Sequence, residues 1–305
     1  MYLAPPIITD TVPAVTNPLP KEIATFGAVH LEVTDLPRSA AFWTEVIGLH
    51  LRSEEVDQIH LGTTTETLVV LYPGAQHAFL PRHSGLYHLA IHPPNETEFA
   101  RILRNLTRAR WRFSPVDHIM SKAIYLNDPD GITVEITLET PERLRELVLT
   151  GESVEATRID GSRASGRDPF DVHTVLAALP NADAGTLVPI GTKIGHVHLH
   201  VGDLLDSYQF YRTLGFSQAL WAPTLGVGDL GAGGAFNHRI AVNTWQGRNA
   251  PQSPVGTARM RHFSIRLDTP QRLDDILGNL EQDTTQTHVG HQIKDPAGNT
   301  IALST

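Results

Sequence analysis

The chain has 305 residues, a formal net charge of −9, 41% hydrophobic and 19% charged residues, 16 histidines and no cysteine. This balance is typical of a globular protein and excludes disordered and fibrous classes. The acidic charge and the lack of a basic run argue against a nucleic-acid partner. The sequence has no long apolar stretch and no signal-like start, so we expect a cytoplasmic protein that does not bind membranes. Without cysteine thiolates, a metal site would need histidine and carboxylate ligands.

A repeat organises the chain. After a proline-rich tail at residues 1–22, Gly27 to Leu36 alternates apolar and polar residues as a strand does. An amphipathic helical segment follows, and Gly48 is placed to end it. The same series returns from Gly195 to Leu204, followed again by a helical segment and by Gly215. The two copies predict two equivalent structural units.

A second, looser pair of copies has the order strand, helix, turn and strand. In one copy these elements lie near residues 86–91, 96–106, 128–131 and 132–136, and in the other near 260–265, 272–280, 295–298 and 300–303. Both turns have an Asp-Pro-x-Gly sequence, in which proline and glycine preset the turn dihedrals. Each turn by itself can serve the fold alone.

The chain therefore divides into four strand-helix-strand-strand-strand modules. We expect modules one and two within 23–150, a polar linker at 151–190 with a short helix near 172–179, and modules three and four within 191–305. This pattern resembles the vicinal-oxygen-chelate superfamily of glyoxalases, bleomycin resistance proteins and dioxygenases. The resemblance implies an α+β fold in which four βαβββ modules pair into two incurved mixed-sheet barrels. Since that fold serves many activities, function has to be argued from the site.

The strongest local signal runs from Val116 to Glu135. It comprises His118, then Tyr125, the turn at 128–131 and Glu135 in the middle of an apolar strand. This spacing resembles the signature of type I extradiol dioxygenases, in which a tyrosine and the turn precede a metal-binding glutamate. A carboxylate among apolar strand residues should be paired or metal-bound if it is buried.

The resemblance also implies where further ligands lie. The equivalent first-strand positions are Ala28, His88, His196 and His262, and the last-strand positions are Glu135 and Ala302. Pairing of modules two and three gives the complete set His88, Glu135 and His196, whereas pairing of modules one and four does not. We therefore predict that modules pair across the middle of the chain. Two histidines and one carboxylate are the usual ligands of non-haem iron(II) oxygenases.

The roles of three other histidines also have to be considered. His198 and His200 share a strand face with His196, because alternate residues point the same way, and either could be the ligand instead. His262 matches a ligand position but lacks partners, so we interpret it as structural.

The resemblance implies three further catalytic side chains. His238, before the last strand of module three, is the acid-base candidate, since an unperturbed imidazole has a pKa of about 6.5. Tyr125 would donate a hydrogen bond to a substrate hydroxyl or an oxygenated intermediate, and His118 would hold a substrate oxygen. The glycine-rich stretch 226–234 is interpreted as a mobile loop over the pocket, and Trp245 as part of the pocket rim.

The sequence thus predicts an extradiol ring-cleavage dioxygenase, of the catechol 2,3-dioxygenase kind, that opens catechol or a substituted catechol with O2 to a 2-hydroxymuconic-semialdehyde-type product. The expected cofactor is Fe(II), with Mn(II) as the alternative. A glyoxalase-type lyase or isomerase and a metal-free small-molecule binder of the same fold are the competing hypotheses. The sequence leaves open the identity of the diol and whether copies assemble into a homo-oligomer.

Overall fold

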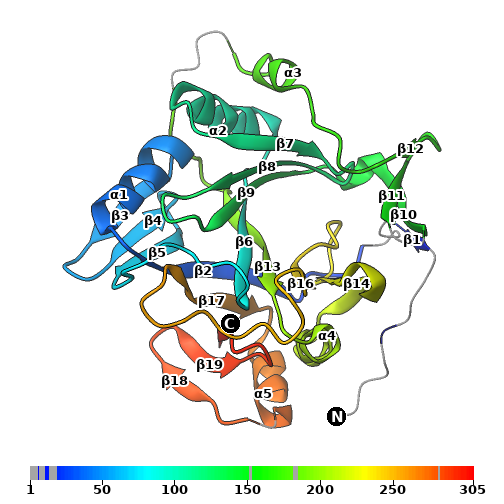
Figure 1. The fold of residues 1–305 in the computed structure, drawn as a ribbon. Helices are drawn as coiled ribbons and strands as arrows, with labels where there is room; N and C mark the ends of the chain where they lie inside the picture. Colours follow the sequence, from blue (N-terminus) through cyan, green and yellow to red (C-terminus); the bar gives the residue numbers. More distant parts are fainter. Residues whose placement is uncertain (1–5, 7–10, 14–18, 151–152, 181–184, 281) are drawn as a thin grey trace.

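Two eight-stranded mixed sheets form the body of the protein (Figure 1). The structure is a computed structural model and describes every residue except 1–5, 7–10, 14–18, 151–152, 181–184 and 281. The strand order is β14-β15-β16-β13-β6-β9-β8-β7 in one sheet and β18-β19-β20-β17-β2-β5-β4-β3 in the other. A single cluster of buried apolar side chains runs through both sheets.

Each sheet combines two modules that are not neighbours in the chain. Module one comprises β2 (Ala24–Val33), α1 (Leu36–Ala41), the π-helical turn η1 (Phe42–Ile47), β3 (His50–Glu54), β4 (Ile59–Gly62) and β5 (Thr67–Pro73). Module two comprises β6 (Gly85–His92), α2 (Glu96–Arg108), β7 (Phe113–Asp117), β8 (Ser121–Asn127) and β9 (Thr133–Glu139). Module three comprises β13 (Lys193–His200), α4 (Leu204–Thr213), β14 (Ser217–Ala222), the short 3-10 turn η3 (Pro223–Leu225), β15 (Val227–Gly231) and β16 (Ile240–Asn243). Module four comprises β17 (Arg259–Leu267), α5 (Pro270–Asn279), β18 (Thr285–Thr287), β19 (Gly290–Lys294) and β20 (Thr300–Ser304).

The predicted pairing across the middle of the chain is confirmed. β6 of module two pairs antiparallel with β13 of module three, and β2 of module one pairs antiparallel with β17 of module four. We call these the second–third half and the first–fourth half. The α+β fold is confirmed as well, although the described strands form open sheets and no closed barrel. In the second–third half a cavity, and no strand pairing, lies between the edge strands β7 and β14.

The same local chemistry begins the main helix of each module. A side chain just before the helix accepts a hydrogen bond from a backbone N–H of the first turn, and the four capping residues are Asp35, Asn95, Asp203 and Thr269. Gly48 ends the first of these helical segments with φ of +94°, which is the left-handed conformation that glycine tolerates best. These signals are local, and so the sequence predicts the helices well.

The two Asp-Pro-x-Gly turns hold modules together. In module two, Asp130 accepts hydrogen bonds from the backbone and hydroxyl of Thr34 and pairs with Arg38 at 2.5 Å, both in module one. In module four, Asp295 accepts a hydrogen bond from the hydroxyl of Tyr211 in module three. The turns therefore have a structural role of their own.

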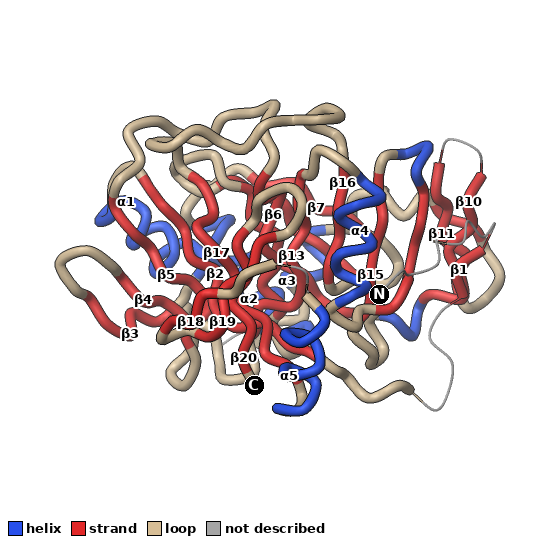
Figure 2. The backbone as a smooth tube through the Cα atoms, turned by 90° about the horizontal axis from the view of Figure 1, so that it is seen from below, coloured by secondary structure: helices blue, strands red, loops and turns tan. Residues whose placement is uncertain are grey.

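A four-stranded antiparallel sheet at one end of the molecule was not predicted (Figures 1 and 2). It consists of β1 (Thr11–Pro13), β10 (Leu144–Thr150), β11 (Ser153–Arg158) and β12 (Arg163–Ala164), and the 3-10 turn η2 (Pro141–Arg143) leads into it. The tail thus contributes β1, and the segment after module two contributes strands as well as the short helix α3 (Val172–Leu176).

The glycine-rich stretch corrects one prediction. Residues 226–234 were expected to form a mobile loop, but most of them form β15, which pairs with β14 on one side and β16 on the other. Gly228 lies against the ring of Tyr208, where an added Cβ would be 2.6 Å from a ring carbon. Close packing explains this glycine better than mobility does. None of the described helices is both long and apolar enough to cross a membrane.

Candidate functional site

Three adjacent strands bring His88, Glu135 and His196 together. In the sheet of the second–third half, His196 on β13 lies opposite Ala90 on β6, and Ala90 lies beside Glu135 on β9. Because Ala90 is small, the imidazole of His196 and the carboxylate of Glu135 can converge above it. His88 lies two residues before Ala90 and shares its face, since side chains alternate along a strand.

The donor atoms of these three side chains form a compact triangle. The distance is 2.9 Å from His88 Nε2 to Glu135 Oε2, 3.2 Å from His196 Nε2 to Glu135 Oε2, and 3.1 Å between the two Nε2 atoms. With metal–ligand bonds of about 2.1 Å, neighbouring octahedral ligands are about 3.0 Å apart and tetrahedral ligands about 3.4 Å. The triangle therefore fits one face of an octahedral divalent cation, the arrangement of the two-histidine, one-carboxylate iron sites.

The electrostatics of the triangle also suit a cation. All three residues are at most 2% exposed. Burial opposes ionisation of Glu135, but the imidazoles of His196 and His88 hold the pKa of its carboxyl well below its usual range. Burial holds the pKa of His196 well below that of a free imidazole, so His196 stays neutral with a lone pair to offer. A buried carboxylate beside the neutral His196 is a favourable place for a divalent ion, which would supply positive charge.

Hydrogen bonds favour His196 over His198 as the ligand. Asn243 Oδ1 accepts from the backbone N–H of Trp245 at 3.1 Å and from His200 Nδ1 at 2.7 Å. The amide group of Asn243 must therefore donate to His198 Nε2, which lies 2.8 Å away. Because burial holds the pKa of His198 well below its usual value, this neutral ring carries its proton on Nδ1 and has no free lone pair there.

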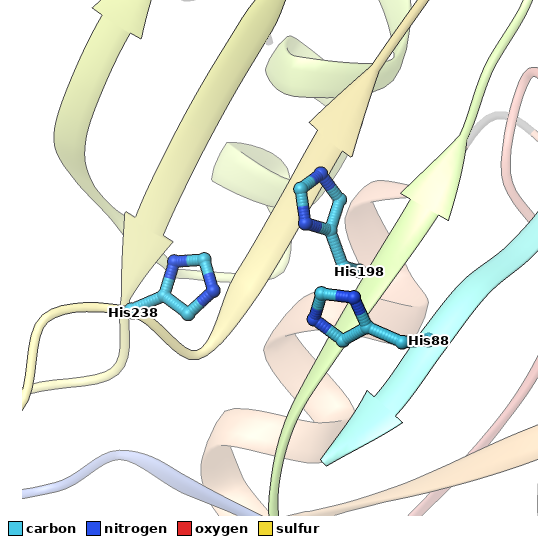
Figure 3. Close-up of side chains that lie close together, drawn as sticks. All are labelled: His88, His198 and His238. Carbon is cyan, nitrogen blue, oxygen red and sulfur yellow. The ribbon is translucent and has the colours of Figure 1, made fainter. Parts of the chain in front are cut away.

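His198 is nevertheless part of the site. Figure 3 shows that His88, His198 and His238 converge from β6, β13 and the segment before β16. One nitrogen of each lies within 4.8 Å of the others. His198 thus presents an N–H donor to the space that the proposed metal ligands and His238 share.

A carboxylate favours the protonated form of His238. Its Nδ1 lies 3.0 Å from Asp229 Oδ2 on β15. Burial opposes protonation of His238, but Asp229 outweighs it and keeps the pKa of His238 above the ordinary value. The ring packs edge-on against His196 with centroids 4.4 Å apart. An imidazole whose protonated form is favoured therefore lies next to a proposed metal ligand, where it can exchange a proton.

Tyr125 and His118 form a directed pair. His118 Nδ1 lies 2.6 Å from the carbonyl oxygen of Gly166, which can only accept, so this nitrogen carries the proton. Burial lowers the pKa of His118, so its Nε2 is a lone pair that accepts from the Tyr125 hydroxyl at 3.1 Å. Burial, followed by the charge of Glu135, raises the pKa of Tyr125 well above its usual value. Tyr125 is therefore a neutral phenol whose oxygen can accept a hydrogen bond from the cavity side.

These side chains border a cavity of about 660 Å³. His88, Glu135, His198 and His238 line its polar end together with Tyr125 and His118. Its apolar lining includes residues of the four-stranded sheet and of module three, among them Leu147, Val154, Ala156, Leu220, Leu225 and Val227. Trp245, predicted to be at the rim, lines the cavity and is 53% exposed. A second cavity, of about 250 Å³, borders Arg261 and Lys294 and includes none of the predicted site residues.

Sequence reasoning missed Asp229 and His92. His92 Nε2 lies 2.9 Å from His196 Nδ1, and burial lowers the pKa of His92 although Glu139 opposes this. His92 could have been found, because it shares the strand face of His88. Asp229 lies within the glycine-rich stretch and gives no comparable signal. His262, interpreted as structural, lies in the first–fourth half and belongs to no group of candidate metal ligands among the described residues.

Comparisons with known proteins agree with this architecture. Residues 25–136 match the family described as Glyoxalase/Bleomycin resistance protein/Dioxygenase superfamily. The matched residues lie within modules one and two. The chain is similar in sequence to the catechol-2,3-dioxygenase of Bacillus subtilis (strain 168). The two are 29% identical over 277 residues, which cover 88% of this chain and 93% of the relative.

Solved structures show a similar fold. Glyoxalase I from Zea mays has a TM-score of 0.53 with 15% identity and covers 92% of each chain. The cppA protein from Streptococcus pneumoniae TIGR4 also has a TM-score of 0.53, with 12% identity over 93% of this chain and 99% of that one. At these identities the likeness concerns the fold alone, so activity has to be argued from the side chains of the site.

Proposed function

We propose that this protein is an extradiol dioxygenase that opens the ring of catechols beside one of the two hydroxyls. The observation that carries the proposal is the triangle of His88, Glu135 and His196, whose donor atoms lie 2.9 to 3.2 Å apart and of which His88 and Glu135 line a cavity. The similarity to a catechol-2,3-dioxygenase supports the same reaction class.

The residues present suit Fe(II), with Mn(II) as the alternative. Two imidazoles and one carboxylate are ligands that both ions accept, and on one octahedral face they leave positions for other ligands. When bound, such an ion would supply Lewis acidity toward the two diol oxygens and a route for electrons between the ring and O2. In the overall reaction both oxygen atoms enter the product, and one ring carbon–carbon bond next to a hydroxyl-bearing carbon breaks.

The surrounding side chains divide the proton transfers. Tyr125, whose own proton is directed to His118, offers its oxygen to a substrate hydroxyl and can pass that proton on to His118 Nε2. His238, whose pKa is raised by Asp229, is the group that donates a proton as oxygen is reduced. His198 offers its Nδ1–H to an oxygen atom of the substrate. These roles combine acid-base catalysis with preorganised hydrogen bonding in a buried site.

The size of the cavity favours substituted catechols. A volume of about 660 Å³ exceeds what a single six-membered ring needs, and the lining includes several aliphatic side chains. We expect the diol to face the triangle and an apolar substituent to lie against Leu147, Val154 and Leu225.

The decisive experiment is anaerobic loading with Fe(II), followed by addition of catechol and of 4-tert-butylcatechol in air. We expect one O2 consumed per diol and a yellow ring-opened semialdehyde that absorbs visible light. Oxygen uptake without the yellow product would point to intradiol or simple oxidation chemistry. A metal-loaded protein that consumes no O2 with any diol would reject the proposal and favour a glyoxalase-type lyase, for which methylglyoxal with glutathione is the first substrate to test.

A further inference from the structure

The proposed ligand His196 is hydrogen-bonded through Nδ1, its second ring nitrogen, to a row of further side chains. His196 Nδ1 lies 2.9 Å from His92 Nε2, and His92 Nδ1 lies 2.8 Å from Glu139 Oε1. His92 and His196 are each 1% exposed, so water does not compete for these bonds. Arg239 donates to the same oxygen of Glu139 at 2.8 Å, and Lys193 lies 3.6 Å from it.

Glu139, the last member of this row of side chains, fixes the direction of both hydrogen bonds. A carboxylate flanked by two cations is an acceptor only, so His92 Nδ1 must donate to Glu139. A neutral His92 that donates from Nδ1 has its lone pair on Nε2, and this lone pair accepts the proton of His196 Nδ1. The lone pair of His196 is then on Nε2, the atom that faces Glu135 and His88.

The backbone is shaped to admit His92. A Cβ atom on Gly195 would lie 2.1 Å from Cγ of the His92 ring, so any other residue at position 195 would displace this ring. Arg239 also donates to the carbonyl oxygen of Gly195 at 3.2 Å. Because Arg239 bonds to Glu139 as well, it links this carboxylate to the strand that carries His196. The ring of His92 further packs edge-on against Phe236 with centroids 5.5 Å apart.

The other proposed histidine ligand lacks such support. His88 Nδ1 is buried without a hydrogen-bond partner, and its ring is held by packing against Tyr87, Tyr125 and His198 instead. The two imidazoles of one site therefore differ in what orients them.

We propose that His92, fixed by Glu139, is a positioning residue that holds His196 in the tautomer and orientation needed to bind the metal. The inference rests on the proposed metal site. Outer hydrogen-bond partners of a ligating histidine fix its tautomer and ring orientation, and their loss weakens metal affinity by about 10- to 100-fold.

The test measures metal binding without substrate. His92→Phe keeps an aromatic ring beside Phe236 but removes both nitrogens, and we expect its dissociation constants for Fe(II) and Co(II), measured anaerobically by competition with a chelator, to rise by about 10- to 100-fold. Lys193→Met is the matched control, because it removes a charge near Glu139 and leaves the contact with His92 in place. We expect its metal affinity to stay within about twofold of wild type.

A spectroscopic readout separates positioning from general loss of structure. In the diamagnetic Zn(II) protein, the slowly exchanging imidazole N–H protons of wild type should include those on His196 Nδ1 and His92 Nδ1. The His196 signal should exchange faster and shift upfield in His92→Phe, where its acceptor is gone, and both signals should be unchanged in Lys193→Met. If His92→Phe does not fold, Glu139→Leu, at a partly exposed position, removes the acceptor and should weaken metal binding in the same range.

The outcomes distinguish this inference from the proposed site. Wild-type affinity in folded His92→Phe, together with lost affinity in Glu135→Ala, would reject the role of His92 and leave the metal site intact. Wild-type affinity in both variants would reject the metal site itself. Weakened binding in both, with the His196 N–H signal shifted upfield in His92→Phe, would support both.

Discussion

The second–third half and the first–fourth half have the same strand arrangement but different side chains at the equivalent ligand positions. Where the former has His88, Glu135 and His196, the latter has His262, Ala302 and Ala28. An alanine in place of the glutamate leaves no anion to offset a divalent cation. The comparison shows that the fold supplies a frame of strands, and that a few side chains determine whether this frame can hold a metal.

In the first–fourth half, His30 and His262 pack against each other. The rings of His30 and His262 stack with centroids 3.7 Å apart, and His30 Nδ1 lies 3.0 Å from the hydroxyl of Tyr72. Burial, together with the neighbouring imidazoles and Arg261, lowers the pKa of His30 to about 2, so this ring stays neutral throughout the physiological range. Clustered histidines are thus compatible with a purely structural role, and the buried carboxylate distinguishes the two halves.

The most direct way to break this comparison is to remove the ligand sets one at a time. We expect Glu135→Ala to lose bound iron on dialysis and to lose ring cleavage completely, since both imidazoles then face an empty position. His262→Ala should keep one metal per chain and wild-type turnover. Metal analysis and O2 uptake measure both. Stoichiometric iron in folded Glu135→Ala would show that the metal lies elsewhere.

A second comparison tests the acid-base group. His238 precedes β16 by two residues, and in the other half Thr67 holds the equivalent place two residues before Val69 in the strand register. His238→Gln can still bond to Asp229 but carries no proton to donate, so we expect kcat to fall by about 10²- to 10⁴-fold with unchanged iron content. Thr67→Val should leave kcat unchanged. A His238→Gln variant with wild-type kcat would remove the proposed role.

A third difference is the four-stranded sheet, which contributes Leu147, Val154 and Ala156 to the cavity of the second–third half. Leu147→Trp should fill the apolar end and lower kcat/KM for 4-tert-butylcatechol by about tenfold or more, whereas catechol itself should change by less than about threefold. Val148→Trp, the neighbouring position on the same strand, is the control for damage to the sheet. Equal losses for both diols in Leu147→Trp would mean that the substituent does not lie against this wall.

The sequence predicted the parts of the molecule that depend on local or repeated signals. The modules and their helices followed from the repeat. The pairing across the middle of the chain followed from the positions that His88, Glu135 and His196 occupy in modules two and three. The short strand β12 and the sheet around it have weak local signals, and their pairing depends on contacts between the tail and the segment after module two. Hydrogen-bond direction was equally inaccessible, because the tautomer of His198 depends on Asn243, which no motif connects with it.

The smallest expected effect concerns the turn aspartates, which both halves retain. Burial, opposed by hydrogen bonds from the backbone of Ile132 and Asp130, raises the pKa of Asp128 from 3.8 to about 7, and one of its carboxylate oxygens is buried without a partner. In Asp295 the corresponding charge is stabilised by the hydroxyl of Tyr211 and the amide of Asn299, although burial still raises its pKa. The two turns thus differ in how well they tolerate an ionised carboxylate.

A raised pKa in the folded state makes stability fall as pH rises. Between 3.8 and about 7 the folded protein holds a proton on Asp128 that the unfolded chain has lost, so the contribution is fully present below pH 3.8 and is lost as pH rises through about 7. Denaturant unfolding at pH 5 and pH 8 should therefore show that Asp128→Asn gains stability relative to wild type at the higher pH, by up to about 1.4 kcal/mol per pH unit in this window. Asp295→Asn should show a weaker trend. An Asp128→Asn variant whose stability relative to wild type is the same at both pH values would mean that this carboxyl is ionised in both states.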